Sequence, residues 1–362
     1  MPPDSRAGRQ ALLRETLAGE QLDGMLVQHL ANIRYLTGFT GSAALLLLRT
    51  GGETILITDF RYAAQAPAEA GNAAEVLIEQ VNLWRRLASH LADRPVDRLG
   101  YESHVATGRD LARLEHVPAG LTPTADIVER LRAVKDPAEV ASIRAAAGLA
   151  SDALGEAIAG VRAGQTEFGV AAALEHALRR RGSEWHPFPT IVASGPRSAL
   201  PHARTSHRVL EPGDLLLLDF GAQVDGYCAD LTRMFVVGRN PDDRQVAVHE
   251  IVREAQCRAI TGMKAGMSSR AADALARDHI AGHGFGEAFG HSLGHGLGLE
   301  VHEAPRLSPA TDDPLPAHAV VTVEPGIYFP GWGGIRLEDD IHLGPGGPEL
   351  LSDGRTELHV IG

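Results

Sequence analysis

The sequence predicts an α/β protein of mixed (α+β) character, organised as two domains. From Arg9 to Ala125, segments with helical patterning alternate with short apolar runs that are typical of strands. After Asp136, long alanine-rich helical segments come first and strands follow them. The boundary is therefore predicted near Thr124, which gives domains of residues 1–124 and 125–362.

In the first domain, the predicted elements begin with the amphipathic segment QALLRETL and the apolar run GMLVQH. SAALLLLRT and ETILITDF are joined through Gly51-Gly52, which predicts a hairpin. EVLIEQ and RLGYE then read as strands, and NLWRRLASHLA and GRDLARLEHV as helices. The sequence of this domain shows no tight cluster of His, Asp and Glu, so we expect it to serve packing, assembly or capping of a substrate rather than chemistry.

The second domain is predicted to begin with a well-capped helix. Asp136 can cap it, Pro137 suits its first position, and Glu139 completes a capping box. Helices are expected over residues 136–161, 166–181, 242–263 and 268–283. The order helix, helix, strands thus occurs twice, which suggests a duplicated architecture.

A hairpin is predicted between two apolar runs, Leu215–Phe220 and Tyr227–Val237. The intervening Asp225-Gly226 favours a two-residue type I′ turn. Such a turn fixes the register, because it places Val224 opposite Tyr227 and, counting back, position 219 opposite position 232.

This register brings two carboxylates together inside an apolar environment. Asp219 and Asp230 become diagonal neighbours on one face, where residues lie roughly 7–8 Å apart and their side chains can converge. A buried, isolated carboxylate is costly. Protonation, a cationic partner or a metal ion can relieve that cost, and two acids aimed at one point favour the metal.

Composition narrows the classes of function. The chain has 44% hydrophobic and 22% charged residues, as an ordinary globular protein does, and a formal charge of −12 argues against a nucleic-acid binder. Only two cysteines are present, which suits a reducing compartment. No secretory signal is visible at the N-terminus, and no run approaches the roughly 18 apolar residues of a membrane span. We therefore expect a cytoplasmic protein that binds neither nucleic acid nor membrane.

Three further segments set acids or histidines into apolar or glycine-rich surroundings. They are HSLGHGLGLEVHE (His291–Glu303), VVTVEPGIYF (Val320–Phe329) and GGIRLEDDIHL (Gly333–Leu343). In the last of these, strand alternation separates an apolar face from a charged face that holds Arg336 and Glu338.

Taken in order, these segments resemble the pita-bread metallopeptidases, which include methionine aminopeptidase, aminopeptidase P and prolidase. The residues that look like the five metal ligands of this family are Asp219, Asp230, His295, Glu324 and Glu338. NIRYLTGFTGS (Asn32–Ser42) is similar to the creatinase-type amino domain, and SGPRSALPHA (Ser194–Ala203) resembles the prolidase segment that carries a substrate histidine. The resemblance covers nearly the whole chain and implies a creatinase-type N-terminal domain followed by a pita-bread catalytic domain.

The resemblance also implies a dinuclear centre of Mn²⁺, Zn²⁺ or Co²⁺. Asp230 and Glu338 would bridge both ions, Asp219 would complete one site, and His295 with Glu324 would complete the other. Two such ions can lower the pKa of a shared water, and the bridging hydroxide would attack the scissile carbonyl. Glu338 or Glu324 would then carry a proton to the leaving nitrogen.

Four other residues match family positions outside the ligand set. His202 and His302 resemble the two histidines that hold the substrate and stabilise the tetrahedral intermediate. His291 and Arg336 match residues of the prolidase and aminopeptidase P branch. His291 would line the proline side of the pocket, and Arg336 would orient Glu338 or pair with the substrate carboxylate.

The resulting functional hypothesis is a prolidase that cleaves Xaa-Pro dipeptides, so its partner is a small peptide with proline at the second position. The nearest alternative is an aminopeptidase P acting on longer peptides; methionine aminopeptidases usually lack so large an N-terminal domain. Alternatives of another class are a pita-bread binding protein without peptidase activity and a metal-free creatinase-like hydrolase. The resemblance further implies a homodimer.

Overall fold

The computed structural model describes residues 5–362 and divides into two compact units after Arg132. Each unit has its own hydrophobic core. None of the helices in the described part of the chain combines the length and apolar character that crossing a bilayer needs.

The first unit is built on a mixed six-stranded sheet of order β4-β3-β2-β1-β5-β6. The predicted hairpin around Gly51-Gly52 is confirmed, because β2 and β3 pair antiparallel with Leu48 opposite Thr54. Leu87 and Leu91 of one covering helix are fully buried against this sheet. Its elements are α1 (Ser5–Gly19), β1 (Gly24–Val27), α2 (Leu30–Thr37), β2 (Ala44–Arg49), β3 (Thr54–Asp59), α3 (Gln65–Ala70), β4 (Glu75–Glu79), α4 (Leu83–Asp93), β5 (Arg98–Glu102), α5 (Gly108–Leu114), β6 (Gly120–Thr124) and α6 (Ile127–Arg132).

The second unit begins with the capped helix that the sequence predicts. Asp136 accepts hydrogen bonds from the backbone of Ala138 and Glu139, and the Glu139 carboxylate accepts one from the backbone of Asp136. The predicted order of two helices followed by strands occurs twice. The elements are α7 (Pro137–Ile158), α8 (Glu167–Arg180), β7 (Ile191–Ser194), β8 (Leu215–Phe220), β9 (Gln223–Val224), β10 (Tyr227–Cys228), β11 (Leu231–Val237), α9 (Asp243–Gly262), α10 (Ser269–Gly282), β12 (Gly294–Gly296), β13 (Glu303–Leu307), β14 (Val320–Val323), β15 (Gly326–Phe329), β16 (Gly333–Arg336), β17 (Asp339–Gly344), β18 (Gly347–Leu350) and β19 (His359–Ile361).

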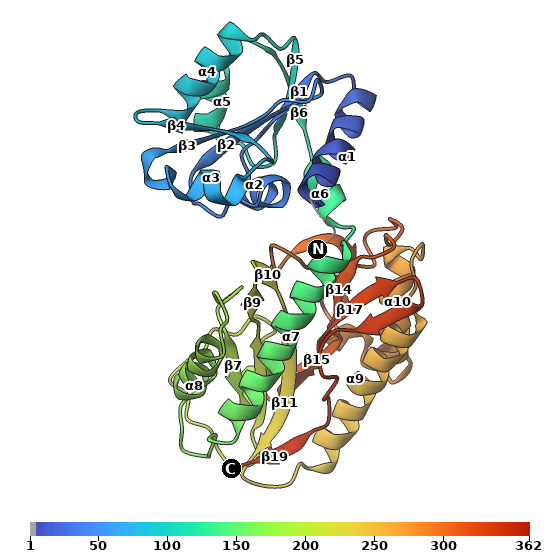
Figure 1. Cartoon of the computed structure of the whole chain (residues 1–362). Coiled ribbons are helices and arrows are strands. Elements are labelled where there is room, and N and C mark those ends of the chain that lie inside the picture. The colour runs from blue at the N-terminus through green and yellow to red at the C-terminus, as the bar shows by residue number, and fades with distance from the viewer. Residues whose placement is uncertain (1–4) are drawn as a thin grey trace. The chain divides into compact units, whose positions relative to one another are not determined.

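Each half of the sequence of this unit contributes one pair of helices, and each pair packs against the sheets. The main sheets have the orders β19-β11-β8-β7 and β13-β12-β14-β17-β18. Helices α7 and α8, coloured green, lie beside the first of these, and α9 and α10, coloured yellow to orange, lie on the other side of the unit (Figure 1). Each helix pair forms a core with residues of β8 and β11, so these two strands are buried on both faces.

The register predicted for the central hairpin is confirmed. Tyr227 lies opposite Val224, and Thr232 lies opposite Asp219. Both turn residues, Asp225 and Gly226, have positive φ, as a type I′ turn requires. Because side chains alternate along a strand, Asp219 shares the face of Leu215 and Leu217, which pack with α9 and α10. The carboxylate therefore projects toward the second half of the unit.

The second half meets this face through strands that are broken or bulged at functional positions. The segment 333–344 forms two strands, and Glu338 lies between them, where it makes an isolated bridge to Thr232 of β11. Strand β12 has a bulge between His295 and Gly296. A Cβ at Gly296 would lie 2.1 Å from the carbonyl oxygen of Ala304, so only glycine fits there.

We expect Gly296→Ala to lower the free energy of unfolding by about 1–3 kcal/mol, because the added methyl group forces β12 and β13 apart. Gly290→Ala is the matched control, since a Cβ at Gly290 would meet nothing within 4 Å. Urea denaturation of both metal-free variants measures the difference. Equal stability of the two variants would contradict the close approach.

Candidate metal centre

All nine site residues that the sequence predicts line one cavity of about 1080 Å³ in the second unit. Within it, His295 Nε2 lies 3.8 Å from Asp230 Oδ2 and 3.5 Å from Glu324 Oε1. Ligand atoms of Asp230, His295 and Glu338 all lie within 4.8 Å of one another. The nine residues are His202, Asp219, Asp230, His291, His295, His302, Glu324, Arg336 and Glu338.

The five predicted ligands come from strands or strand ends of both halves. Asp219 lies on β8, Asp230 directly precedes β11, and His295 lies on β12. Glu324 follows β14, where Pro325 ends the strand, and Glu338 occupies the break between β16 and β17. The β8–β11 sheet supplies the two aspartates and the β12–β14–β17 sheet region supplies the rest, so neither half could build this cluster alone.

The carboxylates of the cluster destabilise one another. Burial, followed by the charges of Glu338, Asp219 and Glu324, raises the pKa of Asp230 well above its ordinary value. Burial and the charge of Glu338 do the same to the pKa of Glu324. Burial and the charge of Asp219 raise the pKa of Glu338 to about 8. These acids can all ionise near neutral pH only if cations join them.

The residues fit a pair of divalent cations. Asp219 Oδ1 and Asp230 Oδ1 are buried and have no hydrogen-bond partner within residues 5–362, so a cation would satisfy them. Burial lowers the pKa of His295 to about 4, and its Nδ1 lies 3.0 Å from the carbonyl oxygen of Gly296. In the neutral ring Nδ1–H donates to that carbonyl, which leaves the Nε2 lone pair directed at the acids. Oxygen donors with one imidazole suit hard or borderline ions.

Arg336 connects the cluster to its surroundings. Its buried guanidinium donates from Nη2 to Asp219 Oδ2 at 2.5 Å and from Nε to Thr232 Oγ1 at 3.1 Å. Nη1 donates to the Pro201 carbonyl and to Tyr328 Oη, each at 3.1 Å. Four of the five N–H groups of a guanidinium are thus used. These contacts support an orienting role for Arg336 more than direct pairing with a substrate carboxylate.

His291 is held as a neutral ring by the same arginine. Arg336 donates to Tyr328 Oη, which leaves the tyrosine hydroxyl proton to donate to His291 Nε2 at 2.9 Å. His291 Nδ1 lies 2.8 Å from the carbonyl oxygen of Ser292, to which it donates. Burial lowers the pKa of His291 to about 4. Both nitrogens are engaged, so His291 offers the cavity a ring face or edge and no free hydrogen-bonding group.

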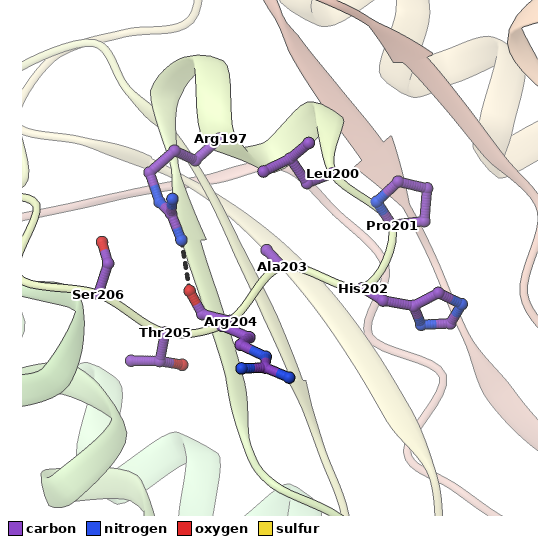
Figure 2. A pocket seen from close by; sticks show the side chains of 8 residues that line it. All are labelled: Arg197, Leu200, Pro201, His202, Ala203, Arg204, Thr205 and Ser206. Carbon is purple, nitrogen blue, oxygen red and sulfur yellow. Dashed lines mark hydrogen bonds between the residues drawn. The ribbon is translucent and has the colours of Figure 1, made fainter.

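The two predicted substrate histidines stand at the edge of the cluster. The His302 ring packs edge-on against His295, with centroids 4.4 Å apart. His202 lies within the segment that is closed by the hydrogen bond from Arg197 to the carbonyl of Arg204, and its imidazole points away from the Arg197 guanidinium (Figure 2). Buried Glu167 supports this segment, because its carboxylate accepts hydrogen bonds from Ser194, Arg197 and Ser206.

Three residues of the site were not predicted from the sequence. Tyr328 and Thr232 lie in motifs already noted, EPGIYF and the hairpin, but their hydroxyl contacts depend on tertiary structure. Arg306 lines the cavity and has no ion-pair partner within the described residues. Burial lowers the pKa of His302, and the positive charge of Arg306 adds to this effect. No sequence signal distinguishes Arg306 from an ordinary surface arginine.

The first unit contains a cluster that its sequence did not reveal. Possible ligand atoms of His104, Asp126 and Glu129 lie within 4.8 Å of one another. Here, however, Glu129 Oε1 accepts hydrogen bonds from Asn32 Nδ2 at 2.6 Å and from His104 Nε2 at 3.1 Å. Burial opposes ionisation of Glu129, but bonds from His29, Asn32 and His104 outweigh it and lower its pKa to about 2. Donors already stabilise this carboxylate, so the cluster has no need of a cation.

Comparison with known proteins agrees with this geometry. Residues 141–345 match the family model described as "Metallopeptidase family M24", and residues 9–134 match "Creatinase/Prolidase N-terminal domain". The chain is 41% identical over 351 residues to "Uncharacterized peptidase YqhT" of Bacillus subtilis, covering 96% of this chain and 99% of that one.

Two solved structures are similar over almost the full length. One is the Xaa-Pro dipeptidase from Bacillus anthracis, with 39% identity, a TM-score of 0.95, and coverage of 99% of this chain and 100% of the other. The second is the X-Pro aminopeptidase from Thermotoga maritima, with 38% identity, a TM-score of 0.90, and coverage of 97% and 99%. The predicted fold, a creatinase-type domain followed by a pita-bread domain, is confirmed.

The metal-free protein should become less stable as the pH rises from about 6.5 to about 8. In this window the folded protein keeps a proton on Glu338, whose pKa is about 8, whereas glutamates of the unfolded chain have lost theirs. Stability falls with pH wherever the folded state binds more protons. The buried neutral histidines, with pKa values of about 4, act only below this window. Urea unfolding in EDTA at several pH values measures the trend, and a rise would contradict the assigned cause.

Asp230→Asn should bind fewer equivalents of Mn²⁺ than the native protein. In the metal-free state the variant should be at least as stable as the native protein, because the change removes one of the mutually repelling acids. Elemental analysis gives the metal content, and thermal unfolding in EDTA gives the stability. Asp312→Asn, at an exposed position, serves as the control. Full metal content together with undiminished turnover in Asp230→Asn would exclude its role as a ligand.

Proposed function

The chain belongs to metallopeptidase family M24, whose members generally bind a pair of metal ions, and on this basis we propose that it hydrolyses Xaa-Pro peptide bonds, chiefly those of dipeptides. One observation carries the proposal: five metal-ligand candidates and two further histidines line a single cavity. The name of the Bacillus anthracis relative, a Xaa-Pro dipeptidase, supports the same substrate class.

The proposed ligands of the two ions, Mn²⁺, Zn²⁺ or Co²⁺, are the five residues of the cluster. Two divalent ions held there supply an ionised water and polarise the substrate carbonyl. The family resemblance implies that Asp230 and Glu338 would be shared by the two ions, while Asp219 would help to hold one ion and His295 with Glu324 the other. Four carboxylates then balance two dications, which removes the repulsion that raises their pKa values.

His202 and His302 are proposed to hold the substrate carbonyl and stabilise the oxyanion that forms from it. Both line the cavity next to the cluster. Burial lowers the pKa of His302, so its ring is neutral at pH 7 and offers one N–H donor. A donor that is already oriented toward the developing negative charge stabilises the transition state without reorganisation.

Proton transfer is assigned to Glu324. Departure of proline requires a proton on its nitrogen, and either Glu324 or Glu338 could carry one. The Glu338 side chain is almost fully buried, and its Oε2 accepts a hydrogen bond from Thr232 at 2.6 Å. The Glu324 side chain is 18% exposed, its Oε1 accepts one long hydrogen bond of 3.4 Å from Thr322 Oγ1, and His295 Nε2 lies 3.5 Å from the same oxygen. Glu324 is thus the freer carboxylate and the better proton carrier.

Proline is accommodated by surfaces that require no amide hydrogen. The nitrogen of an Xaa-Pro bond carries no hydrogen, so a site that relies on a hydrogen bond from the amide N–H cannot use such substrates. His291 presents a neutral ring whose nitrogens are both engaged, and this suits the apolar pyrrolidine. We place the proline ring against it.

The preference for dipeptides is assigned to Arg306. A dipeptide differs from a longer peptide in placing a free carboxylate next to the scissile bond. Arg306 supplies a positive charge in the cavity that no acid among the described residues neutralises. An arginine that binds a carboxylate with two parallel hydrogen bonds gives both affinity and orientation.

A second candidate function is Xaa-Pro aminopeptidase activity on longer peptides. The identity to the Thermotoga maritima X-Pro aminopeptidase, 38%, nearly equals the 39% identity to the Bacillus anthracis dipeptidase. The cavity, about 1080 Å³, is also larger than a dipeptide requires.

The proposal for this protein also includes a homodimer and a cytoplasmic location. The two free cysteines are compatible with a reducing compartment.

Ala-Pro should be hydrolysed with a higher kcat/KM than Ala-Pro-Ala in the presence of Mn²⁺, and EDTA should abolish both activities. Chromatographic release of alanine measures the rates. A higher kcat/KM for the tripeptide would favour the aminopeptidase, and activity in the chelated enzyme would exclude the mechanism.

Arg306→Gln tests the origin of this preference in the same assay. It should raise KM for Ala-Pro by about tenfold, in line with the loss of a charged hydrogen bond. The matched substrate is Ala-Pro amide, which lacks the carboxylate, and its KM should change little. An equal effect on both substrates would remove Arg306 from carboxylate recognition.

A further inference from the structure

Thr232 occupies the contact between the two halves of the catalytic unit. It lies on β11, is fully buried, and faces Asp219 across the hairpin. Its backbone carbonyl accepts a hydrogen bond from the backbone N–H of Glu338 at 3.3 Å, which forms the isolated bridge between the halves. The side chain of Thr232 therefore lies among metal-ligand candidates without belonging to them.

The direction of its side-chain hydrogen bonds follows from the donors. Thr232 Oγ1 lies 3.1 Å from Arg336 Nε and 2.6 Å from Glu338 Oε2. The guanidinium can only donate, so the threonine oxygen accepts from Arg336. Its single proton is then free for one acceptor, the Glu338 carboxylate. The two hydrogen bonds therefore form a chain, which we call the relay, in which Arg336 donates to Thr232 and Thr232 donates to Glu338.

This relay acts on the ligand whose orientation matters most. In the proposed centre Glu338 would have to hold its carboxylate toward the metal pair, and Thr232 is the one side-chain donor to that carboxylate within residues 5–362. The backbone of Glu338 is fixed separately, because its carbonyl accepts from Arg233 Nη1 at 2.7 Å. Main chain and carboxylate are thus anchored by different residues.

We propose that Thr232 is a positioning residue that sets the rotation of the Glu338 carboxylate and so the affinity of the site for its metal pair. This inference rests on the proposed function for the identity of the centre. Its physical basis is general: partners that hydrogen-bond to a metal ligand fix its orientation, and losing one costs about 10–100-fold in metal affinity or activity.

The side chain can be tested apart from the fold, because the backbone bridge uses the carbonyl oxygen of Thr232, which the substitutions proposed here retain. Thr232→Val keeps the branched shape and removes the hydroxyl, whereas Thr232→Ser keeps the hydroxyl. We expect calorimetric Mn²⁺ titration to show about a tenfold loss of affinity in T232V, and T232S to stay within about threefold of the native protein. With Ala-Pro, kcat should fall in T232V about tenfold while KM changes little.

Thr58→Val is the matched control. Thr58 is also fully buried, and its hydroxyl donates to the Ala43 carbonyl in the first unit. Its Mn²⁺ affinity should equal that of the native protein, which separates the role of Thr232 from the general cost of losing a buried hydroxyl.

Two results would overturn the inference: native Mn²⁺ affinity in T232V, or equal impairment of T232S and T232V, which would assign the role to packing. If T232V does not fold, T232S and Thr232→Ala replace it, since they differ only in the hydroxyl, and equal Mn²⁺ affinity of that pair is decisive against the relay. If the native protein cleaves no Xaa-Pro peptide, the proposed function fails, but the Mn²⁺ titrations still decide the role of Thr232.

Discussion

Repulsion among four buried carboxylates is the constraint on which the catalytic unit depends. Asp219, Asp230, Glu324 and Glu338 lie in one cavity, and Arg336 is the one cation bonded to any of them within the described residues. Such an arrangement is unfavourable in the absence of bound cations, because burial raises the pKa of all four acids and like charge adds to the rise for Asp230, Glu324 and Glu338. Two dications would turn the same geometry into a nearly neutral cluster.

The rest of the unit resists this repulsion by fixing the ligands from outside. Arg233 is buried and pairs with Asp339, which also accepts hydrogen bonds from Gln256 and Ser352. Asp340 accepts from the backbone N–H of Asp230 at 3.2 Å. These bonds and the two helix-covered cores supply the rigidity that the cluster itself cannot. Preorganisation of this kind lets the site bind metal without first rearranging.

Residue type alone does not make a metal centre, as the two clusters of this protein illustrate. His104, Asp126 and Glu129 have the ligand types and spacing of a site, yet Glu129 has hydrogen-bond donors around it and a lowered pKa. Asp230 has acids around it and a raised pKa. The surroundings of the carboxylate, rather than its spacing from a histidine, distinguish a stabilised acid from one that needs a cation.

The sequence by itself determined the helices, the hairpin register and the approach of Asp219 to Asp230, because capping residues, an Asp-Gly turn and strand alternation act between neighbours in the chain. The full set of five ligand candidates came from the resemblance of its motifs to a known family. The sequence could not provide the contacts of Arg336 with Pro201, Asp219 and Thr232, or the place of Arg306 in the cavity. Those contacts join segments separated by more than a hundred residues, as in the pairing of Thr232 with Glu338. Only the packing of the two halves against each other decides which polar atoms meet, and this meeting sets the pKa values and the directions of the hydrogen bonds in the site.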